Sequence, residues 1–251
     1  MVTIAKTPAH LAATAATFCA SYISETVNRR GRCSLLLAGG ATPQALYEAL
    51  SRVPYADNLP WAQVVIAFGD ERLVPRDDAR SNQQMVQRAL LDAVPLKPEF
   101  VLAIDTRLPA DQAAAAYEAR LRACFGLQPG ELPDFDLVLL GLGSDGHTAS
   151  LFPGMEAVEE TQRLVVVSPA PDPAGPARLT VTLPVLNAAR TVVFLAQGSE
   201  KAAIVARILQ EDGTETSPAL PAQRVHLTRP DAQVQWFIDE AAAAGLRKAI
   251  V

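Results

Sequence analysis

The sequence predicts an α/β fold with an open, mainly parallel, Rossmann-like sheet and helices on both faces, which is a three-layer αβα arrangement. Short runs rich in Val, Leu, Ile and Phe alternate along the chain with longer, alanine-rich helical patterns. Several of the short runs are apolar at nearly every position, as expected of parallel strands covered on both faces. The chain has 251 residues and no internal repeat, so we expect a single domain over residues 1–251.

The individual elements follow from these patterns. The expected strands are Ser34–Leu37, Val64–Phe68, Phe100–Ile104, Phe135–Leu140, Leu164–Val167, Leu179–Leu183, Val192–Leu195 and Val234–Ile238. The expected helices are Pro8–Asn28, Pro43–Arg52, Asn82–Asp92, Asp111–Phe125 and Ser199–Leu209. Such alternation is typical of right-handed βαβ units, which place helices on both faces of a sheet. Two loops rich in Pro or Gly, Ser168–Pro176 and Asp212–Pro221, do not divide the chain, because strands continue after both.

The composition excludes several classes of protein. The chain has 22 Lys and Arg against 27 Asp and Glu, a formal net charge of −5, which argues against a nucleic-acid partner. Three widely spaced cysteines form no CxxC pair and the three histidines form no HExxH motif, so we expect no metal and no other cofactor. No apolar run approaches the roughly 20 residues of a membrane span, and the N-terminus lacks the apolar segment of a secretory signal peptide. We therefore expect a soluble, cytoplasmic protein without membrane contact.

Four unusual sequences follow predicted strands, at the edge where open parallel sheets bind ligands. These sequences are Gly39–Pro43, Gly69–Arg72, Gly141–His147 and Gly198–Lys201. Any one of them could be ordinary turn chemistry, because Gly, Asp and Ser end strands in many proteins. Four of them at one edge predict a functional site.

The turn after the first predicted strand has the features of an anion site. Thr42 is expected to be the N-cap of a helix and Pro43 its first residue. Gly39 and Gly40, followed by Ala41, remove bulky side chains from the turn and leave its backbone N–H groups open at a positive helix end. A plain tight turn before a helix is the alternative.

Two cations extend this predicted anion site. Lys201 is one of only four lysines, and we expect it in the first turn of a helix capped by Ser199, where its charge opposes the helix dipole. A bound phosphate dianion would make that position favourable. Arg178, which opens a predicted strand, is a second candidate phosphate ligand. In isolation, each of these cations could also be a solvated surface residue.

The loop Gly141–His147 carries a candidate proton carrier, His147, with Asp145 beside it. Histidine can take and return a proton near neutral pH, and its place at a strand end exposes it to substrate. The loop also fits the pattern G-x-G-x-x-G of dinucleotide sites, but Pro153 and Gly154 stop any helix within two turns, which disfavours nucleotide binding.

Three consecutive charges, Asp70, Glu71 and Arg72, follow the second predicted strand. Because consecutive side chains point in different directions, we expect at most two of them to face one cavity. A solvated, mutually paired cluster is the alternative.

Together these motifs resemble the 6-phosphogluconolactonase family of the glucosamine/galactosamine-6-phosphate isomerase superfamily, over about Leu35 to Ala203. The shared motifs are Gly39-Gly40-x-Thr42-Pro43, Gly69-Asp70-Glu71-Arg72 with Val74-Pro75, Ser81-Asn82, Gly141-x-Gly143-x-Asp145-Gly146-His147 followed by Thr148-Ala149-Ser150-Leu151-Phe152-Pro153, Arg178-x-Thr180, and Gly198-x-x-Lys201. The string Asp-Gly-His-Thr-Ala-Ser-Leu-Phe-Pro is the most specific of them. One departure is Ala41, where many relatives have serine; it removes a hydroxyl and leaves the backbone amides.

The resemblance implies hydrolysis of 6-phospho-D-glucono-1,5-lactone to 6-phospho-D-gluconate in the oxidative pentose phosphate pathway. A δ-lactone is an activated ester, so the reaction needs no covalent nucleophile, metal or other cofactor. We expect His147 to deprotonate the attacking water, with Asp145 or Asp70 orienting the histidine or the sugar hydroxyls. The candidates for stabilising the oxyanion are Arg72 and the loop amides of Gly143, Ser144 and Gly146. The candidates for holding the 6-phosphate are Arg178, Lys201 and the turn residues Gly39, Gly40, Ala41 and Thr42.

Two alternatives belong to other classes. Glucosamine-6-phosphate deaminases share the Asp-Gly-His segment but continue with a string like Ile-Ala-Phe-Asn-Glu-Pro, whose glutamate assists ring opening; here Thr148–Pro153 holds no carboxylate. A non-enzymatic sugar-phosphate sensor would keep the phosphate ligands without needing His147. The expected partner is a small phosphorylated sugar lactone, and we expect a monomer, with a homodimer as the alternative.

Overall fold

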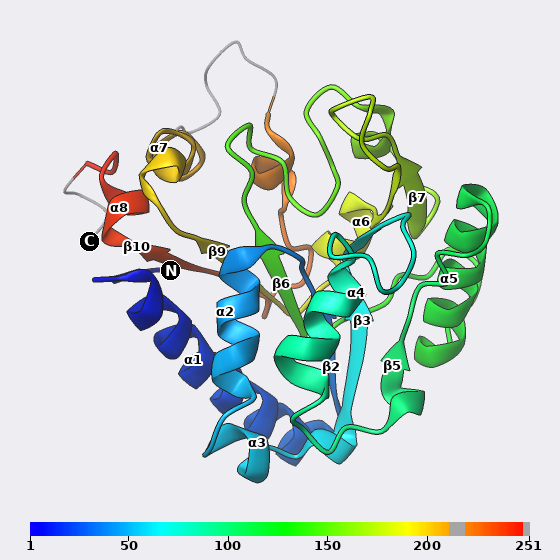
Figure 1. The fold of residues 1–251 in the computed structure, drawn as a ribbon, viewed down its shortest axis with the longest axis horizontal. Coiled ribbons are helices and arrows are strands. Elements are labelled where there is room, and N and C mark those ends of the chain that lie inside the picture. The colour runs from blue at the N-terminus through cyan, green and yellow to red at the C-terminus, as the bar shows by residue number, and fades with distance from the viewer. Residues whose placement is uncertain (211–218, 248–251) are drawn as a thin grey trace.

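A seven-stranded parallel sheet runs through the centre of the computed structural model, which describes residues 1–210 and 219–247 (Figure 1). Its strand order is β1-β10-β9-β6-β2-β3-β5, and every neighbouring pair is parallel. The strands are β1 (Val2–Ala5), β2 (Cys33–Leu37), β3 (Val64–Phe68), β5 (Val101–Leu102), β6 (Leu137–Gly141), β9 (Thr191–Ala196) and β10 (Gln233–Asp239). The predicted open parallel sheet is confirmed.

Strand β1, at the sheet edge, was not predicted. It pairs with β10 in parallel, with Val2 opposite Trp236. A run of four residues is too short to show a clear period, so its position became visible only from the pairing. The first and the last strand of the chain are therefore neighbours in one sheet, and the single domain over residues 1–251 stays a prediction.

A second, three-stranded sheet differs from the prediction. It contains β4 (Asp70–Arg72), β8 (Arg178–Val181) and β7 (Val165–Ser168), in that order and antiparallel. The sequence predicted the last two strands correctly but assigned them to the parallel sheet. A parallel crossover needs about a dozen residues or more, and only residues 169–177 lie between β7 and β8, so this pair must turn back on itself.

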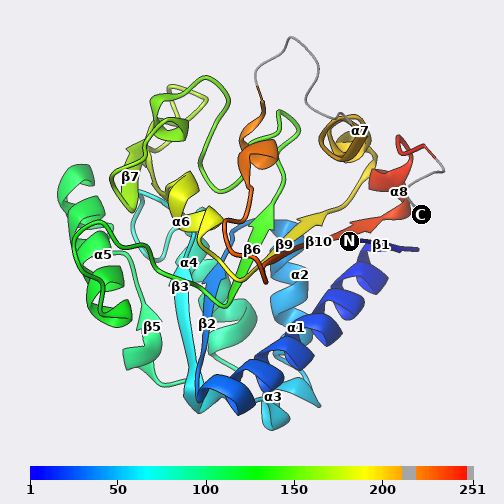
Figure 2. The ribbon, with the colours of Figure 1, turned by 180° about the vertical axis from the view of Figure 1, so that it is seen from behind.

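Helices cover both faces of the large sheet. They are α1 (Pro8–Arg30), α2 (Ala41–Leu50), α3 (Tyr55–Asn58), α4 (Asn82–Val86), α5 (Ala110–Phe125), α6 (Leu183–Asn187), α7 (Ala202–Gln210) and α8 (Glu240–Ala243). In both ribbon views α1 and α2 lie on one side of β9 and β10, and α7 lies on the other (Figures 1 and 2). Helix α5 packs against the second sheet, through β7 and β8.

Local sequence explains where the helices begin and end. Thr7 caps α1 by accepting a hydrogen bond from the His10 amide, Pro8 occupies the first turn, and Gly31 ends the helix in a left-handed conformation. The predicted helix Asn82–Asp92 is α4 followed by one π-helical turn over Gln87–Leu91. The predicted loop Asp212–Pro221 lies mostly outside the described residues.

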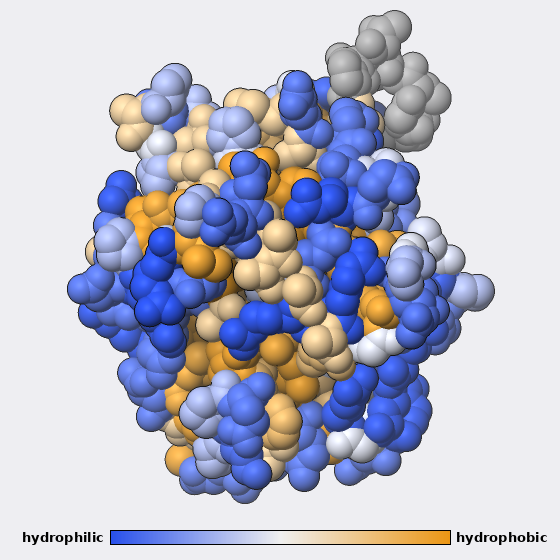
Figure 3. Space-filling view, turned by 90° about the vertical axis from the view of Figure 1, so that its right-hand side faces the viewer, coloured by the Kyte–Doolittle hydropathy of each residue, from blue (hydrophilic) through white to orange (hydrophobic). Residues whose placement is uncertain are grey.

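The core lies between the central strands and the helices. Every residue of β2 and β3 is buried, which explains why these strands are apolar along their whole length. Hydrophilic side chains cover most of the face shown in Figure 3, with smaller apolar groups between them. Among the described residues, no helix combines the length and apolar character that a membrane crossing requires.

Candidate active site

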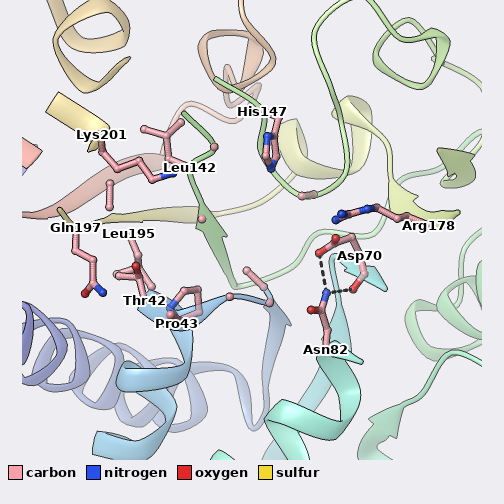
Figure 4. A pocket seen from close by; sticks show the side chains of 18 of the residues that line it. Thr42, Pro43, Asp70, Asn82, Leu142, His147, Arg178, Leu195, Gln197 and Lys201 are labelled. Carbon is pink, nitrogen blue, oxygen red and sulfur yellow. Dashed lines mark hydrogen bonds between the residues drawn. The ribbon is translucent and has the colours of Figure 1, made fainter. Parts of the chain in front are cut away.

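The four sequences predicted to form the site meet in one cavity of about 340 Å³ at the carboxyl edge of the large sheet (Figure 4). The predicted site residues that line this cavity are Gly39, Gly40, Ala41, Thr42, Asp70, Arg72, Gly143, His147, Arg178 and Lys201. Three predicted residues, Asp145, Ser144 and Gly146, do not line it. Parallel strands all end at the same edge, so the chain brings these segments together from four separate crossovers.

His147 and Asp145 form a bonded pair at this edge. Nδ1 of the imidazole lies 2.6 Å from Oδ1 of Asp145, which also accepts the His147 backbone amide at 3.1 Å. When Nδ1 carries the proton that it donates to the carboxylate, Nε2 keeps a lone pair and can act as a base. The ring packs against Phe152, with centroids 4.6 Å apart. Asp145 therefore orients the histidine from behind, which separates its role from that of Asp70.

The charge state of Asp145 suits this role. Partial burial opposes ionisation of the carboxyl, but the hydrogen bonds and the charge of His147 outweigh it and lower the pKa of Asp145. The carboxylate is therefore ionised over the pH range in which a histidine can act as a base. An ionised partner stabilises the imidazolium that forms when His147 takes a proton.

Gly143 provides the space that the imidazole occupies. A Cβ atom on this residue would collide with Nδ1 of His147 and with Oδ1 of Asp145. Glycine is therefore needed at position 143 because a side chain would collide with His147 and Asp145, and not because the backbone conformation excludes other residues.

The predicted oxyanion role of the loop amides is not supported. The Gly143 amide donates to the His147 carbonyl at 2.9 Å, and the Gly146 amide donates to the Gly143 carbonyl at 3.0 Å. Ser144 is exposed and lies outside the cavity lining. The loop uses these glycine amides to hold its own shape, which leaves Arg72 as the predicted oxyanion ligand that faces the cavity.

The three charged residues after β3 form a short strand, β4. Successive side chains of a strand point to opposite faces, so the three do not all face the cavity. Asp70 and Arg72 line the cavity, as expected for residues two apart, and Glu71 points the other way. The Glu71 carboxylate is fully buried and accepts the backbone amides of Asn82 and Gln83 at the start of α4, each at 2.8 Å. Burial raises the pKa of Glu71, although these hydrogen bonds oppose the shift. The prediction of at most two cavity-facing charges is confirmed.

Asn82 was not predicted as a site residue, although it belongs to a quoted motif. Its side-chain amide donates to the Asp70 carbonyl at 2.9 Å and to Asp70 Oδ1 at 3.2 Å (Figure 4). A Cβ atom on Gly39 would overlap the Asn82 side chain, so Gly39 provides room for it. Gln197 also lines the cavity, with a buried and unpartnered Oε1, and no sequence signal indicated it.

Three cations line the cavity without any carboxylate partner among the described residues: Arg72, Arg178 and Lys201. Burial and then the nearby charge of Arg72 lower the pKa of Arg178, while Asp70 opposes the shift. The Arg178 guanidinium also lies 5.3 Å from the centre of the Phe152 ring. Two guanidiniums that lack a carboxylate partner in the described part of the chain, and that lie close enough for the charge of one to lower the pKa of the other, are typical of a site that binds an anion.

The two helix starts at the cavity differ from the prediction in their caps. Helix α2 begins at Ala41 with Gly40 as its N-cap, so Thr42 lies in the first turn. The helical segment with Lys201 starts as a 3₁₀ turn over Ser199–Lys201, with Gly198 as its N-cap. Both capping glycines have positive φ, 101° and 92°, a conformation that a serine or threonine cap rarely adopts. Lys201 still lies at a helix start, as predicted.

The turn before α2 remains suited to an anion. The first hydrogen bond of the helix runs from the Gln44 amide to the Gly40 carbonyl, at 3.0 Å, and no side chain caps the helix. The amides of Ala41 and Thr42 therefore lack a helical partner and lie at the positive end of a ten-residue helix that borders the cavity. Within the described ranges, no group of three or more His, Cys, Asp and Glu side chains is placed to hold a metal ion.

Comparison with known proteins identifies relatives of this chain in sequence and in fold. The chain is 39% identical over 246 residues to the 6-phosphogluconolactonase of Rattus norvegicus, covering 97% of this chain and 92% of the rat protein. It is 37% identical over 226 residues to the 6-phosphogluconolactonase of a Nostoc strain, covering 89% of each chain. The solved 6-phosphogluconolactonase of Trypanosoma brucei superposes with a TM-score of 0.86 at 31% identity over 98% of both chains.

A solved monomeric glucosamine-6-phosphate deaminase shares the fold, with a TM-score of 0.78 at 23% identity. The family model described as glucosamine-6-phosphate isomerases/6-phosphogluconolactonase matches residues 6–236. With a match of this extent and relatives this similar, the chain belongs to the family of glucosamine-6-phosphate isomerases and 6-phosphogluconolactonases.

Proposed function

We propose that this protein hydrolyses 6-phospho-D-glucono-1,5-lactone to 6-phospho-D-gluconate, in the oxidative pentose phosphate pathway. The observation that carries the proposal is the bonded pair His147 and Asp145 beside a cavity with three unpaired cations. A phosphorylated lactone needs both features, a base for its carbonyl and positive charge for its phosphate. The relatives named above carry the name of this activity.

In the proposed mechanism, Nε2 of His147 takes a proton from a water molecule as the water oxygen attacks the lactone carbonyl. The tetrahedral intermediate then collapses, the bond from C1 to the ring oxygen breaks, and the imidazolium returns its proton to that oxygen. The histidine ends neutral, and the product carries a carboxyl group and a new hydroxyl. General acid–base help of this kind is worth about 10²–10⁴ in rate.

Arg72 is the proposed ligand for the developing oxyanion. It lines the cavity beside Arg178, and its Nη1 is held by the Arg80 carbonyl at 2.6 Å, which restrains the guanidinium. A preorganised cation at this position stabilises negative charge more in the transition state than in the bound lactone.

The proposed phosphate site combines Arg178, Lys201 and the amides at the start of α2. Arg178 and Lys201 enter the cavity from opposite sides in Figure 4, with His147 between them. Charge-assisted hydrogen bonds to a phosphate contribute about 1.5–3 kcal/mol each. This anchor fixes the substrate while the carbonyl reaches His147.

The decisive experiment follows the loss of the lactone in real time by ³¹P or ¹³C NMR, with the spontaneous reaction subtracted. We expect turnover far above that background and no release of ammonia from glucosamine 6-phosphate. Binding of 6-phosphogluconate without turnover would instead indicate a sensor, and ammonia release would indicate a deaminase. The monomeric state and the cytoplasmic location stay predictions.

A further inference from the structure

The carboxylate of Asp70 is held from two sides in the wall of the cavity. Oδ1 accepts a hydrogen bond from the Asn82 side-chain amide at 3.2 Å, and Oδ2 accepts one from the Ser150 hydroxyl at 2.6 Å. The residue is only 5% exposed. We propose that Asn82 and Ser150 are positioning residues that hold Asp70 to accept a hydrogen bond from a ring hydroxyl of the lactone, an inference that rests on the proposed function.

Both partners of Asp70 are themselves fixed. The Ser150 amide donates a hydrogen bond to the Thr180 hydroxyl at 3.2 Å, and the Ser150 carbonyl accepts one from the Ser168 hydroxyl at 2.7 Å. The second sheet thus holds Ser150 from β8 and β7 and carries Asp70 on β4. This antiparallel sheet is therefore the frame that sets the direction of the carboxylate.

Asn82 has a single useful orientation. Its amide nitrogen donates to both the carbonyl and the carboxylate of Asp70, and this fixes which end of the side chain faces the strand. The backbone of Asn82 is held in turn by the buried Glu71 carboxylate. A residue held by two side-chain hydrogen bonds and one backbone hydrogen bond serves positioning rather than loose packing.

Asp70 retains unused acceptor capacity on the cavity side. A carboxylate has about four acceptor sites, and the protein fills two of them, through Asn82 and Ser150. The other hydrogen bond from Asn82 goes to the backbone carbonyl of Asp70. No ion pair within 4.0 Å involves Asp70 in the described part of the chain, and His147 is oriented by Asp145 instead. The remaining acceptor sites of this carboxyl group suit hydroxyl donors, and the ring of a gluconolactone presents hydroxyls at C2, C3 and C4.

The test measures kcat/KM for 6-phospho-D-glucono-1,5-lactone and for its 2-, 3- and 4-deoxy analogues. A site that pairs a substrate hydroxyl rejects an analogue lacking that hydroxyl, and for a bond to a charged group we expect a loss of about tenfold to a hundredfold with one analogue. In Ser150→Ala and in Asn82→Ala this discrimination should fall to about threefold or less, because the carboxylate is no longer held in the accepting position.

Ser34→Ala is the matched control. The Ser34 hydroxyl also donates to a buried aspartate, Oδ2 of Asp136, at 2.8 Å, but this pair lies at the opposite edge of the large sheet. The control removes a chemically similar hydrogen bond and should leave the discrimination between substrates unchanged, whatever it does to stability.

The outcomes separate this inference from the proposed function. Equal turnover of all three deoxy analogues by the wild type, with activity still dependent on His147, overturns the hydroxyl contact and leaves the lactonase proposal intact. Full discrimination retained in both Ser150→Ala and Asn82→Ala overturns the positioning role. Absence of lactone turnover by the wild type refutes the proposed function itself. If either variant fails to fold, Asp70→Asn provides the same comparison, and it should lose the discrimination.

Discussion

Similar serine–aspartate pairs lie at the two ends of the parallel strands, but the charges around the two pairs differ. The amino edge is the side of the large sheet where its strands begin, and the carboxyl edge is the side where they end. At the amino edge, Ser34 donates both its amide and its hydroxyl to Asp136. At the carboxyl edge, Ser150 donates its hydroxyl to Asp70. All four residues are buried, and each pair joins segments far apart in the sequence.

The charges around the two pairs differ. At the amino edge, Arg30 and Arg190 lie 3.3 Å and 3.6 Å from Asp136, and both also contact Asp134. Arg229 contacts Asp134 as well. At the carboxyl edge, the described residues offer no carboxylate within ion-pair distance of the three cavity cations. The amino edge neutralises its charges internally for stability, whereas the carboxyl edge leaves positive charge for a ligand.

Replacing His147 with alanine tests the carboxyl edge most severely. We expect kcat to fall by about 10²–10⁴, because the variant loses its general base and general acid together. The melting temperature should change little, since the side chain is 30% exposed and, among the described residues, its hydrogen bond goes to Asp145 alone. Initial rates measured against the spontaneous reaction check this, and a variant within a few-fold of the wild type would exclude the proposed mechanism.

Gly143→Ala should displace the imidazole without removing it. The added Cβ collides with Nδ1 of His147, so we expect kcat to fall by about tenfold to a hundredfold, as misplacement of a catalytic group does. Gly141→Ala, at the end of β6 and two residues away, is the matched control, because its Cβ would lie 3.9 Å from the Gly39 carbonyl oxygen, an ordinary contact. Equal losses in the two variants would contradict this role of Gly143.

Replacing one cation at each edge with alanine tests directly whether the two edges differ in function. Lys201→Ala should raise KM by about tenfold with a small change in kcat, because the phosphate is bound in the ground and transition states alike. Arg190→Ala should leave KM unchanged and lower the free energy of unfolding by about 1–3 kcal/mol, since it leaves Asp134 and the buried Asp136 short of a partner. Steady-state kinetics and urea unfolding on both variants measure the two effects, and the reverse pattern would refute the contrast.

The smallest expected effect concerns pH. The folded-state pKa of Asp145 is lowered, so the stability from its bond to His147 is present above the unfolded pKa of about 3.9 and is lost as the pH falls through the folded value. Asp145→Asn should therefore be less stable than wild type near pH 6, with a gap that closes in acid. We expect under about 1 kcal/mol, because the side chain is 48% exposed. Urea titrations between pH 2 and 7 measure this gap, and one that widens in acid would contradict the assignment.

Much of the site was visible in the sequence because strand ends carry their own signals. Glycine at a turn, charge after an apolar run and histidine in a glycine-rich loop are local features, and parallel strands bring them to one edge without further information. The caps were predicted wrongly for a local reason too. Serine and threonine usually cap helices, but Gly40 and Gly198 adopt a backbone conformation that favours glycine.

The second sheet could not be predicted in this way. Strands β7 and β8 have the same apolar character as the parallel strands, and Asp70–Arg72 has the composition of a loop. Only pairing in space decides which sheet a short strand joins, because the hydrogen bonds that define the pairing join residues distant in the chain. The roles of Asn82 and Ser150 depend on that pairing and were therefore out of reach.

By itself the sequence determined the fold class, the edge that carries the chemistry and half of the residues that line the cavity, including His147 and the three cations, because periodicity and turn chemistry are local properties. The tertiary structure decided how those groups are used. It assigned Asp145 to the histidine and Asp70 to Asn82 and Ser150, engaged the loop amides elsewhere, and left three cations unpaired. Which partner a charged or polar group finds depends on distances across the fold, and those distances exist only once the chain has packed.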